Sequence, residues 1–506
     1  MKTQRIPLVG SVINRNVNPS AFSTKDQFFT NCYPDTAINS ITGKAKAYLN
    51  KRPGSSAGGA LAGVDSPAGA SCLWSSNTSV PSPAVFGFIN TGLGSTSVWN
   101  NSDTKIGGDI ANTISCLSLT EASVNGTGTL TGIFIDGSAT EAWYFPQGGA
   151  WTQITDGDFP PNLGSPENLV GDIIHLNGRA YVMTTNGKIW NSDQNSLANW
   201  TASAFNTAQS YPDGGVGLAR YKDLIAAFGK YSIEFFQDVG LTPSPIVTIG
   251  SSVNRVGIEA SGSIGYNKRI FPVGNTVYFI GISSESGTRG VYRLNGFAAE
   301  KISNSAIDKL MNGASASSLK IDGIAGAFTA HGMEHLLMYQ SGESAINCYC
   351  ITTNTWWVLN LSQDHTPYTI IGYYGSFYFQ TENDAKIHSS LSNNPVFTDA
   401  AVAYTQTIQL ESMDMGTGKK KFWKRIRPIG DIQSSASALT VSYADDDYTT
   451  YTTAGTIDLS SRQAMEQGLT APNLGSSRRR SWKLTHAANT PNRLEAIDIE
   501  FEIGSS

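Results

Sequence analysis

Along much of the chain, apolar and polar residues alternate with a period of two, in short runs that end at Gly, Asn or Pro. The clearest case is 214–240. Its apolar run 224–228 is too short for a helix, and residues 231–236 follow the two-residue period of a strand. Between them, the Gly229–Lys230 step predicts a tight turn in which Gly takes a positive φ. We therefore expect a hairpin.

Seven stretches share this layout: a strand ending in Gly or Asn-Gly, a second strand rich in Tyr, Phe, Ile and Val, and a third that often ends near Trp or Lys-Ile. They are 84–101, 132–155, 172–193, 214–240, 271–303, 328–360 and 368–391. Their spacing of roughly 35 to 60 residues is typical of propeller blades.

Each such sheet leaves two apolar faces that only neighbouring sheets can cover, so closure into a ring is expected. We predict an all-β protein whose residues 71–400 form a β-propeller of about six blades, with the first unit poorly formed. Seven blades are the alternative count. Stacked β-sandwiches would suit the same alternation and remain the alternative fold.

The two ends of the chain differ from this repeat. Prolines interrupt residues 1–70 repeatedly, which predicts an extended N-terminal arm with short strands, and the Gly/Ala/Ser-rich stretch 54–69 predicts a loop. Residues 401–506 carry longer alternating strands. We expect an additional antiparallel β-sandwich or platform domain there, formed by the C-terminal and N-terminal regions.

One short helix is expected between blades, at 303–313. Ser305 is its predicted N-cap and Gly313 its predicted C-cap.

Composition supports the β prediction. Charged residues make up only 15% of the 506 residues, and there are 51 glycines, which favours short strands and tight turns over helices or disorder. The net charge is −5: residues 401–506 hold 12 basic and 12 acidic residues, which leaves 23 against 28 for residues 1–400. This balance argues against a general nucleic-acid binder.

Cysteine usage and hydropathy indicate where the chain is made. The five cysteines are an odd number at scattered positions, and we expect all to be reduced: Cys32, Cys72, Cys116, Cys348 and Cys350. No stretch has the length and apolarity of a signal peptide or membrane span, so we expect a soluble chain made in the cytoplasm, with no membrane insertion.

Two motifs could indicate metal binding. His331 and His335 match an H-x-x-E-H zinc-protease pattern, but in a strand their imidazoles would lie about 13 Å apart, so no zinc site is expected. The run 445–447 of three aspartates could hold Ca²⁺, although a solvated turn is the favoured interpretation. Nucleotide-binding and hydrolase motifs are absent from the sequence. We predict no enzyme activity, no catalytic residues and no cofactor.

Two basic clusters, 419–427 and 478–483, are interleaved with aromatic residues. Such segments could bind phosphates and stack bases. In alternating strands, however, Trp and Ile face the core and leave Lys and Arg on one solvent or partner face. The candidate subunit or adaptor interface comprises Lys419, Lys420, Lys421, Lys424, Arg425, Arg427, Arg478, Arg479, Arg480 and Lys483.

Five segments in this order resemble the packaged-DNA stabilisation or tail nozzle proteins of short-tailed bacteriophages: 48–54 (YLNKRPG), 217–240, 251–281, 290–303 and 419–427. The resemblance spans most of the chain. It implies a structural virion protein of the phage tail, assembled in the host cytoplasm, that forms a homohexameric ring below the portal and adaptor. Such a ring extends the DNA channel, retains the packaged genome and conducts it during ejection, and the family has no catalytic residues.

The resemblance also implies partners: the portal-adaptor (head-to-tail connector) ring, a tail fibre or tailspike, a distal plug or needle protein, and double-stranded DNA in transient passage. DNA must slide through such a channel, so we expect the acidic excess of residues 1–400 to line it. The basic C-terminal strands would then face neighbouring subunits or the adaptor.

A glycan-binding or glycan-cleaving propeller, such as a tail fibre or lectin-like protein, is the alternative function. It needs exposed aromatic platforms, and a hydrolase also needs a pair of carboxylates. The candidates are Glu141, Trp143, Tyr144, Trp356 and Trp357, which are more simply explained as blade core.

Overall fold

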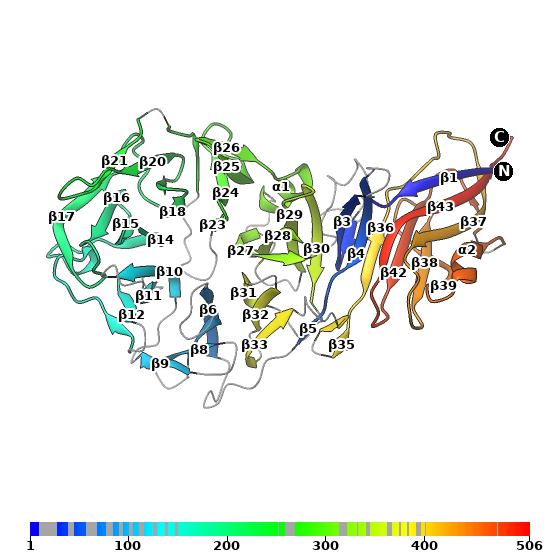
Figure 1. The fold of residues 1–506 in the computed structure, drawn as a ribbon. Coiled ribbons are helices and arrows are strands. Elements are labelled where there is room, and N and C mark those ends of the chain that lie inside the picture. Colours follow the sequence, from blue (N-terminus) through cyan, green and yellow to red (C-terminus); the bar gives the residue numbers. More distant parts are fainter. Residues whose placement is uncertain are drawn as a thin grey trace.

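The structure is a computed structural model, and it describes residues 1–9, 28–38, 45–56, 68–76, 84–90, 95–100, 105–110, 116–124, 129–136, 140–146, 150–250, 252–258, 269–312, 321–330, 332–340, 345–361, 367–373, 376–381, 384–390, 396–399, 401–472 and 474–505. It consists of a ring of β-sheets and, beside it, a β-sandwich that carries both chain termini (Figure 1). The predicted fold class, an all-β propeller with a platform made from both ends of the chain, is confirmed.

The ring sheets take their strands from consecutive parts of the chain. The first contains β6 (Ala68–Ser76), β7 (Ala84–Asn90), β8 (Thr96–Asn100) and β9 (Lys105–Ile110), and the second β10 (Cys116–Val124), β11 (Thr129–Asp136), β12 (Ala142–Pro146) and β13 (Thr152–Gln153). The third contains β14 (Leu169–Leu176), β15 (Arg179–Thr184), β16 (Lys188–Ser192) and β17 (Trp200–Thr207), and the fourth β18 (Gly217–Tyr221), β19 (Leu224–Phe228), β20 (Ile233–Asp238) and β21 (Ile246–Thr248). The fifth contains β22 (Val256–Gly257), β23 (Ile270–Val273), β24 (Thr276–Ser283), β25 (Arg289–Asn295) and β26 (Ala298–Lys301), and the sixth β27 (Ile321–Ala330), β28 (Met333–Gln340), β29 (Ala345–Cys350) and β30 (Thr355–Asn360). The seventh contains β31 (Pro367–Tyr373), β32 (Ser376–Thr381) and β33 (Asp384–Ser390).

Contacts between successive sheets close the ring. β6, β10, β14, β18, β23, β27 and β31 contact one another in this order, and β31 contacts β6. The last sheet is completed from the N-terminal region: β5 (Ser55–Ser56) pairs with β33, and β34 (Thr398–Asp399), which pairs with β35 (Val402–Ala403), runs parallel to β5. Segments that precede and follow the propeller in the chain therefore pair where it closes.

The described residues form seven such sheets, which corrects the expected number of about six. The alternative count of seven matches these sheets, and the first unit, which was expected to be poorly formed, has four paired strands. Its strand β6 has the sequence AGASCLWSS and directly follows a stretch rich in the same small residues, so composition did not separate the strand from the loop before it.

Apolar side chains fill the spaces between successive sheets. Ile133 and Val182 belong to one buried cluster between the second and third sheets. Phe228 of the fourth sheet lies against Phe279 of the fifth, with ring centroids 5.2 Å apart. This packing buries both faces of the sheets, as the hydrophobic effect requires.

The hairpin expected at 214–240 is present as β18 to β20, but Gly229 serves a different purpose from the one predicted. Among residues 217–238, which span β18 to β20, the residue with a positive φ is Lys222, at 57°, and Gly229 has none. A Cβ at Gly229 would lie 2.6 Å from Oδ1 of Asp213, whose carboxylate accepts hydrogen bonds from the Tyr231 amide and the Ser232 hydroxyl. Close approach, rather than backbone conformation, explains the glycine.

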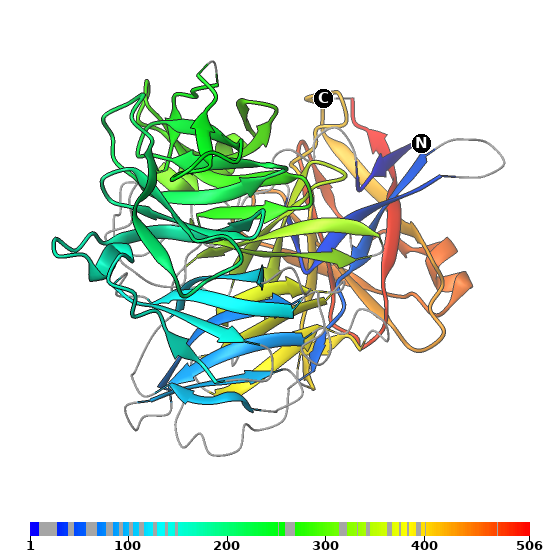
Figure 2. The same cartoon turned by 60° about the vertical axis from the view of Figure 1, so that its left-hand side comes forward.

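Two sheets form the sandwich, and both include N-terminal strands (Figure 2). One has the order β3 (Cys32–Ile38), β4 (Ala45–Lys51), β43 (Arg493–Ile503), β37 (Lys421–Gly430) and β40 (Leu469–Thr470), with β1 (Lys2–Pro7) on β43 and β41 (Ser476–Ser477) on β37. The other has the order β2 (Phe28–Thr30), β36 (Gln406–Gln409), β42 (Ser481–His486), β38 (Ala438–Ala444) and β39 (Thr452–Asp458). Because β2 also pairs with β30, the second sheet continues the sixth sheet of the ring.

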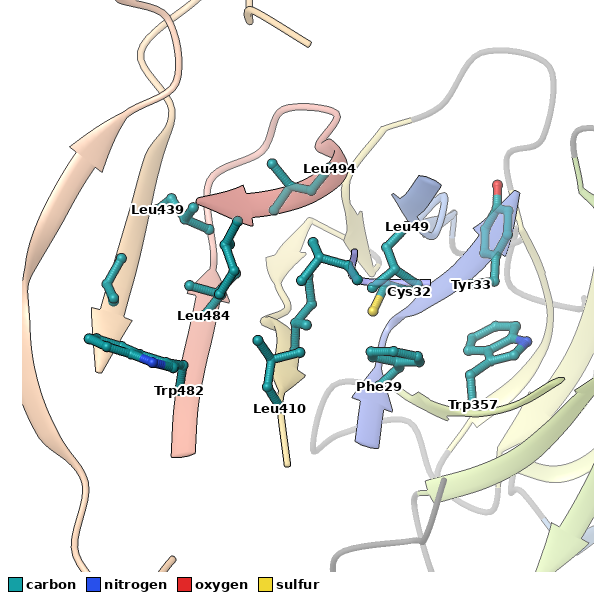
Figure 3. Close-up of a cluster of buried hydrophobic side chains, with 14 of the residues drawn as sticks. Phe29, Cys32, Tyr33, Leu49, Trp357, Leu410, Leu439, Trp482, Leu484 and Leu494 are labelled. Carbon is teal, nitrogen blue, oxygen red and sulfur yellow. The ribbon is translucent and has the colours of Figure 1, made fainter. Parts of the chain in front are cut away.

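One hydrophobic core crosses the boundary between ring and sandwich. Figure 3 shows part of it: Phe29, Cys32, Tyr33, Leu49, Trp357, Leu410, Leu439, Trp482, Leu484 and Leu494. The two units therefore bury apolar surface against each other rather than being linked by a loop alone.

The helices are short. In α1 (Ser305–Asn312) the side chain of Asn304 accepts the Ile307 amide at 3.0 Å, so Asn304 rather than Ser305 is the cap; Gly313 lies outside the described residues. A second helix, α2 (Arg462–Gln467), was not anticipated, and a 3₁₀ turn, η2, spans Pro160–Asn162. Within the described residues, no helix is long and apolar enough to span a membrane.

Candidate functional site

Three cations of β37 pair with acidic residues of the neighbouring strand β43. The pairs are Lys424–Glu502 at 3.0 Å, Arg425–Glu500, and Arg427–Asp498 at 2.8 Å. A register shift between Trp423 and Arg425 lets Trp423 and Ile426 both face the core, as expected for the apolar residues of this strand. Much of the first basic cluster is therefore neutralised within the chain.

Asp498 is the centre of this row of charges. Arg5 of β1 also donates to its carboxylate, at 2.9 Å, so cations from two different strands flank one buried acid. Burial by itself raises the pKa of Asp498, but the hydrogen bonds from Arg5 and Arg427 outweigh it and hold the pKa below its ordinary value.

Two of the ten candidate residues are buried, which corrects the expectation that all ten face solvent or a partner. Lys421 is fully buried, and its Nζ donates to the carbonyl oxygens of Thr417 and, at 2.6 Å, Arg478. Burial lowers its pKa. A strand-face argument missed this because the two carbonyl groups that accept from Lys421 lie in the loop before β37 and in the segment after β41, not on a strand.

Arg480 is the second buried cation. Its guanidinium donates to both carboxylate oxygens of Asp445, at 2.7 and 2.6 Å, and lies 3.8 Å from the ring centroid of Tyr443. Trp423 and Trp482 flank it at 5.1 Å. These contacts make it part of the sandwich core.

The remaining candidates are Lys483, whose Nζ lies 4.5 Å from the Tyr451 ring, and four exposed cations, Lys419, Lys420, Arg478 and Arg479. Within the described part of the chain, none of these four forms an ion pair. The structure thus brings all ten residues into the sandwich but leaves four with an unneutralised, accessible charge.

The candidate metal ligands have structural partners. Asp445 binds Arg480, and Oδ1 of Asp446 accepts the amides of Thr449 and Thr450 at 3.1 and 2.9 Å. His335 is buried in β28, where its Nδ1 accepts from Nε1 of Trp357 at 3.2 Å. His331 lies outside the described residues, among which no cluster of metal-ligating side chains occurs.

The proposed aromatic platforms are mostly core residues. Trp143 is buried, and Trp356 and Trp357 point to opposite faces of β30, one into the core shared with the fifth sheet and one into the core shared with the sandwich. These positions therefore offer no exposed surface to a sugar ring.

A buried junction that the sequence did not predict joins ring and sandwich. Arg52 is fully buried and donates to both carboxylate oxygens of Asp399, at 2.9 and 2.5 Å. It also donates to the Asn31 side chain at 2.8 Å and to the carbonyl oxygen of Asn360 at 3.0 Å, and the Tyr404 ring stacks on it at 3.7 Å. One guanidinium thus connects the N-terminal arm, the end of β30, and the chain segment that leaves the propeller.

Lys51 extends this junction into the sandwich. Its Nζ donates to the carbonyl oxygen of Ala488 at 2.7 Å and lies 4.8 Å from the Tyr404 ring. Burial, and secondly the charge of Arg52, lower the pKa of Lys51 to about 7. Burial and the Lys51 charge lower the pKa of His486 to about 4, and its Nε2 lies 2.7 Å from the Ser437 hydroxyl.

The junction explains why YLNKRPG stands out in the sequence. Leu49 lies in the shared core, Lys51 and Arg52 make the contacts above, and a Cβ at Gly54 would lie 2.0 Å from the carbonyl oxygen of Thr398. The available signal was a Lys-Arg pair between an apolar strand and a Pro-Gly turn.

Comparison with protein families places these features in context. Residues 36–389 match the family model described as "Bacteriophage P22 Gp10, beta-propeller". The match covers nearly all of the propeller, together with Lys51, Arg52 and Gly54 of the junction. No curated protein matches the sequence.

The similarity to solved structures is low. A virginiamycin B lyase from Staphylococcus aureus is 12% identical with a TM-score of 0.42, covering 65% of this chain and 97% of that one. A streptogramin B lyase is 14% identical with a TM-score of 0.39, covering 72% and 98%. The Cps50 (Swd1) β-propeller domain of Myceliophteria thermophila is 6% identical with a TM-score of 0.40, covering 67% and 99%.

Proposed function

Because the chain belongs to the bacteriophage P22 Gp10 β-propeller family, we propose that it is the tail nozzle subunit of a short-tailed bacteriophage. In this role, six copies form a ring that extends the DNA channel of the portal and adaptor, retains the packaged genome and conducts it during ejection. The match over 36–389 is the observation that carries the proposal. It supports a structural β-propeller protein of a phage tail.

Charge and packing support the same role. Residues 1–400 carry 28 acidic against 23 basic residues, and a channel wall with this balance would let DNA slide rather than hold it. The shared core and the Arg52 junction make the two units suited to transmit load as one body. We propose no catalytic role for the subunit.

The partners follow from the position of such a ring. Its head-proximal side meets the portal-adaptor ring, its distal side meets a tail fibre or tailspike and a plug or needle protein, and double-stranded DNA passes transiently through its centre. The protein is then a component of the virion tail that assembles in the host cytoplasm.

Electron microscopy of the purified full chain and of virion tails tests the proposal. The expected result is six-fold rings with a central opening, in solution or at the tail. Single particles without rings in both preparations, combined with binding on a glycan array, would instead identify a lectin-like propeller.

A further inference from the structure

Four exposed cations gather at the end of the sandwich farthest from the ring. β37 begins at Lys421, which pairs with Ser477 of β41 on one side and with Ile503 near the C-terminus on the other. Figure 1 shows both termini at this end. Lys420 and Arg478 each lie one residue beyond the Lys421–Ser477 pair, and Lys419 and Arg479 follow them. We call Lys419, Lys420, Arg478 and Arg479 the basic end.

The four cations of the basic end differ in their contacts from the other Lys and Arg residues of 401–506. Of the twelve Lys and Arg residues in 401–506, six form ion pairs with other described residues: Lys424, Arg425, Arg427, Arg462, Arg480 and Arg493. Lys421 donates to two carbonyl groups and Lys483 lies over an aromatic ring. The four that remain all belong to the basic end. Within the part of the chain that the structure describes, no ion pair offsets their mutual repulsion.

The neighbouring carboxylates at this end accept hydrogen bonds from backbone amides. Oδ1 of Asp414 accepts the Gly416 amide at 2.9 Å, and Oδ1 of Asp446 accepts the Thr449 and Thr450 amides. These acids stabilise their own loops, and neither forms an ion pair with the basic end within the described residues.

An exposed aromatic ring accompanies the cations. Phe422 is 44% exposed, and the Nζ of Lys420 lies 5.9 Å from its ring centroid. Aromatic and Arg side chains together are enriched in protein–protein interfaces, whereas binding to a DNA backbone needs only the cations. The combination therefore favours a protein partner with an acidic surface.

We infer that the basic end docks on an acidic face of a second copy of this chain. The whole chain has a net charge of −5, so without the four charges of the basic end the rest carries −9, and the charge balance of a neighbouring copy is opposite in sign to the basic end. A contact between two different faces of the same chain is head-to-tail, which generates a ring when the rotation closes. This inference rests on the proposed ring and specifies one of its contacts.

Sedimentation velocity of the purified full chain at about 50 to 500 mM NaCl tests the docking. Wild-type association should weaken as salt rises, because surface charges are screened. The R478E/R479E variant should associate at least about tenfold more weakly at low salt, since like charges now meet. The matched control K222E/K230E reverses two exposed cations of the propeller and should associate like wild type.

The outcomes separate this inference from the proposed function. If wild type forms no oligomer at any salt concentration or in virion tails, the ring itself is refuted. If wild type forms rings and R478E/R479E forms them equally well, only the docking of the basic end on a second copy is refuted. If these variant rings then lack another protein or DNA that wild-type rings bind, the basic end is assigned to that partner. An equal weakening of association in K222E/K230E would also refute the docking, because the change in net charge alone would then explain the effect.

Discussion

The ring and the sandwich are both β-structure, but different interactions determine their pairing. In the ring, apolar side chains from successive sheets meet, as Phe228 and Phe279 do. The strands of each sheet are close in sequence, except that β5 completes the last one. In the sandwich, strands from opposite ends of the chain pair, and rows of opposite charge such as Arg427–Asp498 line them. Local repetition builds one region, and long-range pairing builds the other.

This difference shows which contacts determine how the ring closes. A ring of similar sheets could close in several registers, but β5 from the arm completes only the last sheet, and Arg52 fixes that arm against Asp399. The buried ion pair at the junction thus determines how the repeated region ends. Substitutions at the junction should cost more than substitutions inside a repeated sheet.

The largest effect is expected for Arg52→Ala. It leaves the Asp399 carboxylate buried without its guanidinium, which costs about 3 to 5 kcal/mol of unfolding free energy. Urea denaturation measures this loss. The exposed Arg462, paired only with Glu466 on the surface, provides the control, and Arg462→Ala should change stability by less than about 0.5 kcal/mol. Equal effects would contradict the junction's special role.

Gly54→Ala should have the second-largest effect on the free energy of unfolding. The new Cβ would lie 2.0 Å from the Thr398 carbonyl oxygen, so β5 and β34 must separate, at a cost of about 3 kcal/mol. Gly164→Ala is the matched control because nothing lies within 4 Å of a Cβ there. Thermal unfolding of both variants checks the difference, and a tolerated Gly54→Ala would show that the closure is not tightly packed.

A substitution inside the ring should lower the free energy of unfolding by a smaller amount. Phe228→Leu keeps most of the buried apolar volume but loses the edge-to-face contact with Phe279, about 1 kcal/mol. Urea denaturation should give a stability between those of wild type and Gly54→Ala. A loss as large as that of Arg52→Ala would mean that the ring packing, not the junction, dominates.

The smallest effect concerns the charged row of the sandwich. The folded-state pKa of Asp498 is lowered, so its charge contributes stability above the unfolded pKa of about 4, and this contribution is lost as pH falls through the folded pKa. Asp498→Asn should lose about 0.5 kcal/mol at pH 7, because the two arginines are partly solvated. The difference from wild type should shrink below about pH 4. A difference that stays constant from pH 7 to pH 3 would contradict an electrostatic role.

The sequence indicated most of the ring because its strands are local: β18 to β20 lie within 22 residues and follow a two-residue period. It indicated the first sheet as a unit at 84–101, which was expected to be poorly formed because the small residues of β6 resemble a loop. The ion pairing of the basic residues was harder to predict from the sequence. Arg425 and Glu500 are 75 positions apart, and Arg52 and Asp399 are 347 apart, so no local pattern shows which cations are paired and which remain for a partner.

The coupling of ring and sandwich through the arm is tested most directly by scanning calorimetry of the full chain, with Arg52→Ala measured alongside. A shared core and a shared buried ion pair predict one cooperative unfolding transition for wild type, which separates into two transitions when the guanidinium is removed. Two independent transitions in the wild-type chain, unchanged by Arg52→Ala, would contradict it.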